Sequence, residues 1–275
     1  MTSILALDAA WTIRQPSGVA LLSDSTGQWR CVALAPSYER FQARAHDQLV
    51  DWAGEITAST ANVASLLDAS RAMAGEDVDV VTIDMPVSRV NITGRRPADD
   101  AVSRHFGAAG CSTHSPSALR PGVLGQNLTE AFERRGYPLA TTSSRGPGTR
   151  ALYEVYPHPA LLLLLDEQYR IPYKVAKSST YWPGVALAQR HERIVALWHQ
   201  ILGALGSSII GIDLVLPSVA AAGALTSAYL KRYEDALDAL IGGWIGIQLL
   251  EGRGTPYGDE LAAIWIPERP FPPVA

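Results

Sequence analysis

The chain has little cysteine, no long apolar run and no excess of positive charge. Its two cysteines, Cys31 and Cys111, are too few for a disulfide framework, so we expect a protein of the reducing cytoplasm. No apolar run reaches the roughly 18 residues that a membrane-spanning helix needs, so no membrane partner is expected. The first apolar run lacks a preceding basic region and is interrupted by Asp8, unlike a secretory signal. A net charge of −4 argues against a general binder of nucleic acid.

The charges are distributed unevenly along a chain that is 47% hydrophobic, which is typical of a globular domain. From Arg89 to Arg150 there are nine arginines, two aspartates and two glutamates, so this segment has a charge of +5 and the remainder −9. We expect one domain over residues 1–275, with 87–150 as an Arg-rich, loop-rich insertion. A basic segment on an acidic body is typical of a protein that meets an anionic ligand at one face. Arginines scattered over a solvated insertion explain the same count.

The first apolar run, Ser3 to Leu7, ends in a carboxylate, Asp8. An apolar run without alternation predicts a strand buried on both faces. An ionised carboxylate at its end is costly unless a cation meets it, although Asp8 could instead cap the turn that follows. Further strands at 18–22 and 29–34, joined by short turns, predict an antiparallel meander.

A second buried-strand pattern, 78–83, also ends in an aspartate, Asp84. Helical spacing at 47–56 and 61–73 predicts a crossover between the meander and this strand, which would then run parallel to the first. Asp8 and Asp84 would therefore face one crevice at the carboxyl edge of the sheet.

Residues 87 to 169 contain short predicted elements. We expect helices at 98–106 and 127–135, a third strand at 152–156 and a helix at 159–169. Glu154, within the third strand, faces either the crevice or solvent.

Three stretches follow before the end of the chain. Residues 186–203 predict a clear helix, and 262–267 a terminal strand or extended segment. The apolar stretch 209–229, interrupted by Pro217, predicts a helix buried against the sheet or at the contact of a homodimer.

Residues 233–244 place two aspartates among apolar residues. Asp235 and Asp238 are three apart and share one face of a helix. A cation between this helix and the sheet explains carboxylates on an otherwise apolar helix. The alternative is that both lie in the first turns, near the positive end of the helix dipole.

Other chemistries have weaker support. His105, Cys111 and His114 are only three ligands at an irregular spacing, so loop residues are favoured over a zinc site. The glycines of 146–148 are not followed by the Lys-Ser/Thr of a phosphate-binding loop. No Gly-x-Ser-x-Gly elbow occurs, so covalent nucleophilic catalysis is not favoured.

The candidate site is therefore a set of carboxylates at strand ends and on one helix: Asp8, Asp84, Glu154, Asp235 and Asp238. Such a set selects hard cations, Mg²⁺ or Mn²⁺, over zinc. Two such ions about 4 Å apart can clamp the attacking and leaving oxygens of a phosphodiester displacement. Arginines of the insertion would contact phosphates.

Several motifs occur in a characteristic order: Leu7-Asp8, Ile83-Asp84-Met85-Pro86, Arg95-Arg96 with Asp99, Asp100 and Arg104, Ser115-Pro116, Glu154-Val155-Tyr156-Pro157, Asp235-Ala236-Leu237-Asp238-Ala239 and Ile264-Trp265. Together they span nearly the whole chain. The set resembles the family catalogued as domain of unknown function 429, regarded as predicted nucleases of the ribonuclease-H-like fold.

The resemblance implies an α/β fold with a mixed five-stranded sheet, its first three strands antiparallel, flanked by helices and with the insertion after the fourth strand. It assigns the metal ligands to Asp8, Asp84, Asp235 and Asp238, with Glu154 as a further catalytic carboxylate. Substrate-binding residues would be Arg95, Arg96 and Arg104. Where family members often have glycines after the first aspartate, this chain has Ala9-Ala10-Trp11, a bulkier turn beside Asp8.

The leading hypothesis is a metal-dependent nuclease that hydrolyses phosphodiester bonds of nucleic acid. The negative net charge favours short, structured or single-stranded substrates over long duplex. The alternative is a non-catalytic module of the same fold that binds an anionic ligand or partner. A phosphoryl-transfer enzyme of actin-like architecture is disfavoured, because no Gly-rich phosphate loop follows the first strand.

Overall fold

In the computed structural model, which describes residues 2–144 and 150–268, eight strands form one mixed sheet. The strands are β1 (Thr2–Asp8), β2 (Gly18–Asp24), β3 (Trp29–Ala35), β4 (Val80–Ile83), β5 (Ala151–Val155), β6 (Ile209–Ile210), β7 (Gly254–Gly258) and β8 (Ala263–Pro267). Their order is β6-β3-β2-β1-β4-β5-β8-β7. The prediction of five strands was therefore wrong, because β6 extends one edge, and β8 with β7 extends the other. Arg145 and the glycines of 146–148 lie outside the described residues.

The centre of the sheet agrees with the sequence patterns. β1, β2 and β3 form the predicted antiparallel meander, whereas β4 runs parallel to β1, and β5 parallel to β4. The last paired residues of β1 and β4 are Leu7 and Ile83, and the amide of Asp84 donates to the carbonyl of Leu7 at 2.9 Å. Asp8 and Asp84 consequently leave adjacent parallel strands side by side.

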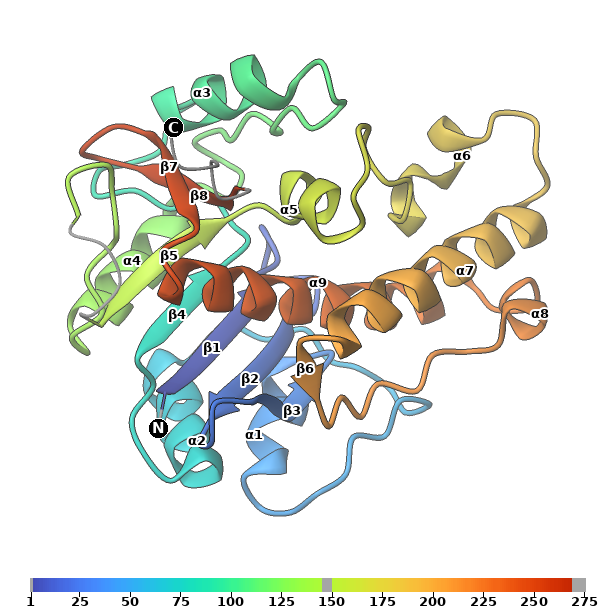
Figure 1. Cartoon of the computed structure of the whole chain (residues 1–275), viewed down its shortest axis with the longest axis horizontal. Helices are drawn as coiled ribbons and strands as arrows, with labels where there is room; N and C mark the ends of the chain where they lie inside the picture. The colour runs from blue at the N-terminus through green and yellow to red at the C-terminus, as the bar shows by residue number, and fades with distance from the viewer. Residues whose placement is uncertain (1, 145–149, 269–275) are drawn as a thin grey trace, which may run out of the picture.

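Helices cover both faces of the sheet (Figure 1). They are α1 (Tyr38–Arg44), α2 (Val63–Ala74), α3 (Pro97–Phe106), α4 (Val123–Glu133), α5 (Pro157–Leu164), α6 (Ser178–Tyr181), α7 (Leu187–Gly206), α8 (Val219–Ala222) and α9 (Ser227–Leu250). Alternate residues of β1 belong to different cores: Ile4 and Ala6 pack with α7 and α9, whereas Leu5 and Leu7 pack with α1, α2 and α4. The strand is buried on both faces, as its unalternating sequence predicts.

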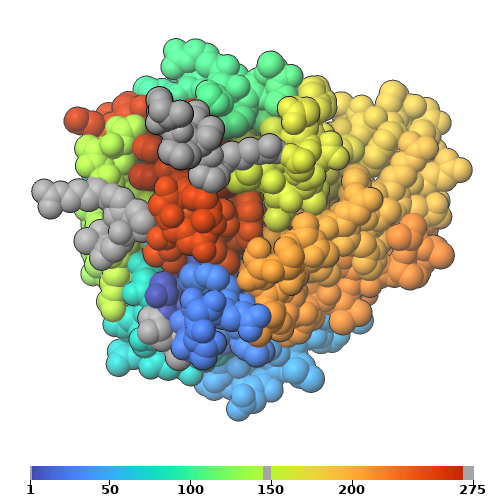
Figure 2. Space-filling view, viewed as in Figure 1, coloured from blue at the N-terminus to red at the C-terminus, as the bar shows by residue number. Residues whose placement is uncertain are grey.

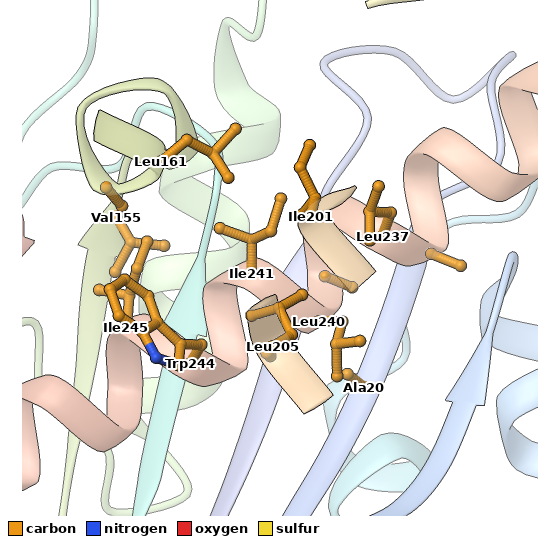
Figure 3. Packing of buried hydrophobic residues seen from close by; sticks show 14 of the residues in the cluster. Ala20, Val155, Leu161, Ile201, Leu205, Leu237, Leu240, Ile241, Trp244 and Ile245 are labelled. Atoms are coloured by element: carbon orange, nitrogen blue, oxygen red, sulfur yellow. The ribbon is translucent and has the colours of Figure 1, made fainter. Parts of the chain in front are cut away.

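The long helix α9 lies directly on the sheet and joins distant parts of the chain. Figure 3 shows Leu237 and Leu240 of α9 beside Ile201 and Leu205 of α7. In the space-filling view, the last part of the chain, in red, adjoins the first strands, in blue (Figure 2).

Glycines set the close approach of α9 to the sheet. A Cβ atom on Gly243 would lie 2.7 Å from Leu22 Cδ1, and one on Gly246 would lie 2.8 Å from Ile4 Cγ2. At the other end of the contact, a Cβ on Gly18 of β2 would overlap the carbonyl oxygen of Asp235. The acidic part of α9 is thus held against the carboxyl end of β1.

Several predicted helices are confirmed, and α2, α3 and α7 match the ranges 61–73, 98–106 and 186–203 closely. The helix predicted at 127–135 begins earlier, as α4, and the one at 159–169 begins at Pro157 and ends at Leu164. Asp166, just beyond it, has a φ of 56°, which a helix does not allow.

Two helix predictions were wrong. Residues 47–56 form turns, because Asp47 has a φ of 58° and the Asp51 carboxylate accepts from the amides of Ala53 and Gly54, which competes with a helix. The stretch 209–229 is not one buried helix but β6, an irregular segment, α8 and the start of α9. Its pattern did not account for Gly211, whose φ is 70°. Among the described residues, no helix combines the length and apolarity that crossing a membrane requires.

Candidate functional site

A cavity of about 560 Å³ opens at the carboxyl ends of β1, β4 and β5. Most of its lining comes from the loop after β1, the residues after β4, the end of β5 with the residues that follow it, the loop between α3 and α4, the segment 170–177, and the first half of α9. Its acidic residues are Asp8, Asp84, Asp99, Glu154, Glu234 and Asp235. Its basic residues are His114, Arg120, His158, Arg170, Lys174, Lys177 and Lys231.

Asp8 and Asp84 form the part of the cavity nearest the sheet. They have the same strand parity as Ala6 and Thr82, which lie against Gly242 of α9, so their side chains project to the α9 side. Burial raises the pKa of Asp84 to about 7, against the attraction of nearby lysines. The pKa of Asp8 is also raised well above its ordinary value, first by burial and then by the charges of Asp238 and Asp235.

The carboxylates of α9 are held by lysine. Lys231 binds Glu234 at 2.9 Å and also binds Asp235, one helical turn away on the same face. Lys174, in the segment before α6, binds Asp238, which also accepts a hydrogen bond of 2.7 Å from the Tyr173 hydroxyl. The partners of Asp235 and Asp238 in the structure are therefore ammonium groups of the chain itself, and the metal ion predicted between this helix and the sheet stays a prediction.

The positions of these aspartates in α9 test the alternative that they lie near the positive end of the helix dipole. Asp235 is the ninth residue of the helix, beyond the first turn in which the helix dipole acts. The dipole explanation was therefore wrong, and burial together with neighbouring charges sets the pKa of these carboxyls. Burial raises the pKa of Asp235 to about 6, although the ammonium of Lys231 lowers it.

The cluster has more carboxylates than cations. Five acidic side chains, Asp8, Asp84, Glu234, Asp235 and Asp238, face only Lys174 and Lys231, which leaves a formal excess of three negative charges when all are ionised. No hydrogen bond to the carboxylate of Asp8 or Asp84 occurs among the described residues. These two are the uncompensated members of the cluster.

This donor set fits a single hard divalent cation better than two. Both oxygens of Asp238 accept from Tyr173 and Lys174, so that residue has no oxygen free of a protein partner. Among the described residues, no group of three or more His, Cys, Asp and Glu is already arranged around a metal position. Mg²⁺, however, is usually held by one or two carboxylates together with water and substrate phosphates, and Asp8 and Asp84 meet that requirement.

Glu154 has a different partner. Arg96 donates to both of its oxygens, at 2.6 and 2.7 Å, and also to both oxygens of Asp99, at 3.0 Å. The amide of Val87 donates to Glu154 as well. All three charged side chains are buried, so this group fastens α3 to β5 beside the cavity.

Most of the chain matches one known protein family. The family described as protein of unknown function (DUF429) matches residues 15–262. The chain belongs to the DUF429 family. No curated protein and no solved structure matches the chain. The match includes Asp84, Asp235 and Asp238, and it begins after Asp8.

The arginines predicted to bind substrate in this DUF429 chain lie elsewhere. Arg96 is buried in the group with Glu154, and Arg95 binds Asp100 and Ser103 at the surface. Arg104 is exposed on α3. None of the three is among the described residues that line the cavity. His105 makes tilted ring contacts with Phe106 and Tyr257 and is not among the described residues that line the cavity, whereas His114 is.

Sequence patterns missed the basic residues that do line the cavity. The DUF429 chain contains only three lysines, Lys174, Lys177 and Lys231, and all three line it. This scarcity against twenty arginines is a signal that could have identified them. Arg120 and Arg170 had no such signal, because their place in the cavity depends on loops whose course the sequence patterns do not determine.

Proposed function

We propose that this DUF429 chain is a metal-dependent hydrolase of phosphodiester bonds in nucleic acid, a nuclease of ribonuclease-H-like type. One observation supports it most strongly: Asp8 and Asp84, from adjacent parallel strands, lie uncompensated in a cavity with basic side chains on its other walls. The central strand order β3-β2-β1-β4-β5, closed by α9, is consistent with the ribonuclease-H-like proposal.

Asp8 and Asp84 would hold Mg²⁺ or Mn²⁺. A bound ion would lower the pKa of its water and offset charge on the phosphate. Lys174 and Lys231 neutralise Asp238 and Asp235, which reduces the need for a second ion. The proposed site therefore holds one ion, whereas the sequence hypothesis had two.

Asp235 is the residue we assign to proton transfer. Its Oδ1 accepts from Lys231, whereas its Oδ2 has no hydrogen bond among the described residues, and the side chain lines the cavity. In this proposal Asp235 Oδ2 takes the proton of the attacking water. Lys231 holds the carboxylate in place.

The size of the cavity favours a small part of a nucleic acid. A volume of about 560 Å³ is in the range of sites for single small molecules, and suits a nucleotide rather than a duplex. The negative charge of the chain as a whole also disfavours long duplex, whose affinity depends on neutralised phosphates.

The first experiment is calorimetric titration of the wild-type protein and Asp84→Asn with Mn²⁺, followed by hydrolysis assays on end-labelled single-stranded RNA and DNA. We expect one ion per wild-type chain, loss of that binding in Asp84→Asn, and at least a hundredfold loss of hydrolysis in both Asp8→Asn and Asp84→Asn. Asp68→Asn, at an exposed position of α2, is the matched control and should keep both properties. Hydrolysis that persists in both site variants would refute the assignment.

A non-catalytic module is the second candidate, favoured by the lysines that already neutralise two of the carboxylates. It predicts that an anionic ligand binds equally well with a chelator and in Asp8→Asn. Hydrolysis dependent on Mn²⁺ and lost in Asp8→Asn would contradict it.

A further inference from the structure

Part of the cavity lining is basic, and we call Arg120, Arg170 and Lys177 its basic wall. Arg120 comes from the loop between α3 and α4, and Arg170 and Lys177 come from the segment after α5. His114 lines the same cavity: partial burial lowers its pKa, and the charges of Lys177, Arg170 and Arg120 lower it further. Unlike Lys174 and Lys231, neither Arg120 nor Lys177 forms an ion pair with a carboxylate among the described residues.

His158 carries a buried hydrogen-bond donor without an acceptor in the described part of the chain, and this observation is independent of the charges of the basic wall. It lines the cavity and is only 5% exposed, and its Nε2 lies 2.7 Å from Arg170 Nη2. A guanidinium can only donate, so Nε2 accepts, and the proton of the neutral ring is on Nδ1. Among the described residues, that Nδ1–H has no acceptor.

The ring of His158 is also fixed in place. Tyr156 and Tyr173 make edge contacts with it, at centroid distances of 5.4 and 5.3 Å. The ring is held neutral, because burial and the charges of Lys174 and Arg170 lower its pKa well below the ordinary value. Arg170 Nε is a second buried donor without an acceptor among the described residues. Buried donors of this kind indicate an acceptor that the chain itself does not supply.

We propose that Arg120, Arg170 and Lys177, together with His158, form an anion subsite that binds a phosphate group of the substrate without a metal ion. The ligand's identity as a nucleic-acid phosphate rests on the proposed function, and its negative charge rests on the basic wall alone. Arginine matches phosphate geometry by paired hydrogen bonds, and lysine contributes a point charge.

The subsite narrows the substrate to a phosphorylated strand end. The guanidinium of Arg120 lies 5.6 Å from the ring centroid of Trp11, and both residues line the cavity, so the insertion and the loop after β1 meet in its lining. In this proposal a strand enters the cavity by its end. Its terminal phosphate lies on the basic wall, and the neighbouring diester lies toward Asp8 and Asp84.

The test is calorimetric binding in EDTA, with inorganic phosphate, a nucleoside monophosphate, and a single-stranded hexanucleotide with and without a terminal phosphate. We expect the phosphorylated hexanucleotide to bind at least tenfold more tightly than the unphosphorylated one. The double variant Arg120→Gln/Lys177→Gln should remove this preference, because it takes two positive charges from the basic wall, and both side chains are exposed. Lys177→Arg should retain it, and so should Arg134→Gln, an exposed arginine outside the cavity lining.

Equal affinity for the two hexanucleotides, or an unchanged preference in the double variant, would overturn the subsite as a strand-end site. Binding of inorganic phosphate alone would do the same, and would assign the wall to free phosphate. The outcome is separable from the proposed function. Phosphate-dependent binding in EDTA without Mn²⁺-dependent hydrolysis supports the subsite and refutes the nuclease, whereas hydrolysis without that binding does the reverse.

Discussion

At the scale of single residues, the carboxylates around the cavity differ in what neutralises them. Lysines hold Asp235 and Asp238, and Arg96 holds Glu154. Asp8 and Asp84 have no such partner among the described residues. The same substitution, carboxylate to amide, should therefore have different consequences at different positions.

The pH dependence of stability tests the state of Asp84. Its pKa is about 7 in the folded chain against 3.8 as the ordinary value, so between these values the folded state keeps a proton that the unfolded state has lost. The contribution of this group to stability therefore falls as pH rises from about 4 to 7. Asp84→Asn removes this loss.

We expect the stability of Asp84→Asn relative to wild type to rise between pH 5 and pH 8, by about 2 kcal/mol since the carboxyl is partly open to the cavity. Urea unfolding in EDTA at both pH values measures it. Asp68→Asn, at an exposed position of α2 outside the cavity lining, should show no such trend. A difference between wild type and Asp84→Asn that is independent of pH would contradict the raised pKa.

The buried group of Arg96 supports a second prediction. Arg96→Met would leave the carboxylates of Glu154 and Asp99 buried without their cation, and such a loss costs about 3–5 kcal/mol. Arg104→Met, on an exposed face of α3, should change the free energy of unfolding by less than about 0.5 kcal/mol. Urea unfolding measures the free energy of unfolding of both variants. Equal losses would show that Arg96 stabilises the fold no more than the exposed Arg104 does.

At the scale of elements, α9 defines the site because it lies so close to the sheet. Its acidic residues are in its first half, and its glycines are in its second half, where Gly242, Gly243 and Gly246 face β1, β2 and β4. The helix is thereby pressed onto the strands that end in Asp8 and Asp84. Gly18 permits the same approach at the end nearest the carboxylates.

Substitution of Gly18 tests this contact. Gly18→Ala places a methyl group where the backbone of Asp235 lies, so α9 or β2 must shift, and we expect a loss of about 3 kcal/mol in unfolding free energy. Gly203→Ala is the control, because it is an exposed glycine inside α7 with open space around it, and it should stabilise by about 0.5–1 kcal/mol. Thermal unfolding of both variants is the measurement. A neutral Gly18→Ala would show that α9 can yield without cost.

Sequence patterns predicted elements where the local signal and the tertiary contacts agree. The helices α2, α3 and α7 have clear helical spacing, the strands of the meander are apolar runs joined by short turns, and all are present. The pattern at 47–56 has helical spacing too, but the Asp51 carboxylate bonds to nearby amides and a turn forms. The spacing of hydrophobic residues carries no information about such hydrogen bonds between a side chain and the nearby backbone.

At the scale of the whole molecule, the parallel arrangement of β1 and β4 could be predicted, and the proximity of Asp8 and Asp84 with it. Which cation would pair with which carboxylate could not be predicted. Lys174 lies 64 residues from Asp238, and Arg96 lies 58 residues from Glu154. Such pairs are created by the path of the irregular segments between β4 and α9, for which neither periodicity nor turn chemistry gives a rule.

The scarcity of lysine has a practical consequence. Apart from the terminal amine, every amine of this chain is at the cavity, and Lys177 is the exposed one. Although burial alone would lower the pKa of Lys174, the Asp238 and Glu234 carboxylates raise it well above its ordinary value, and Lys231 is likewise kept protonated by Asp235 and Glu234. An acylating reagent would thus mark the mouth of the cavity and little else. Coupling the protein to a support through lysine would turn that mouth toward the support.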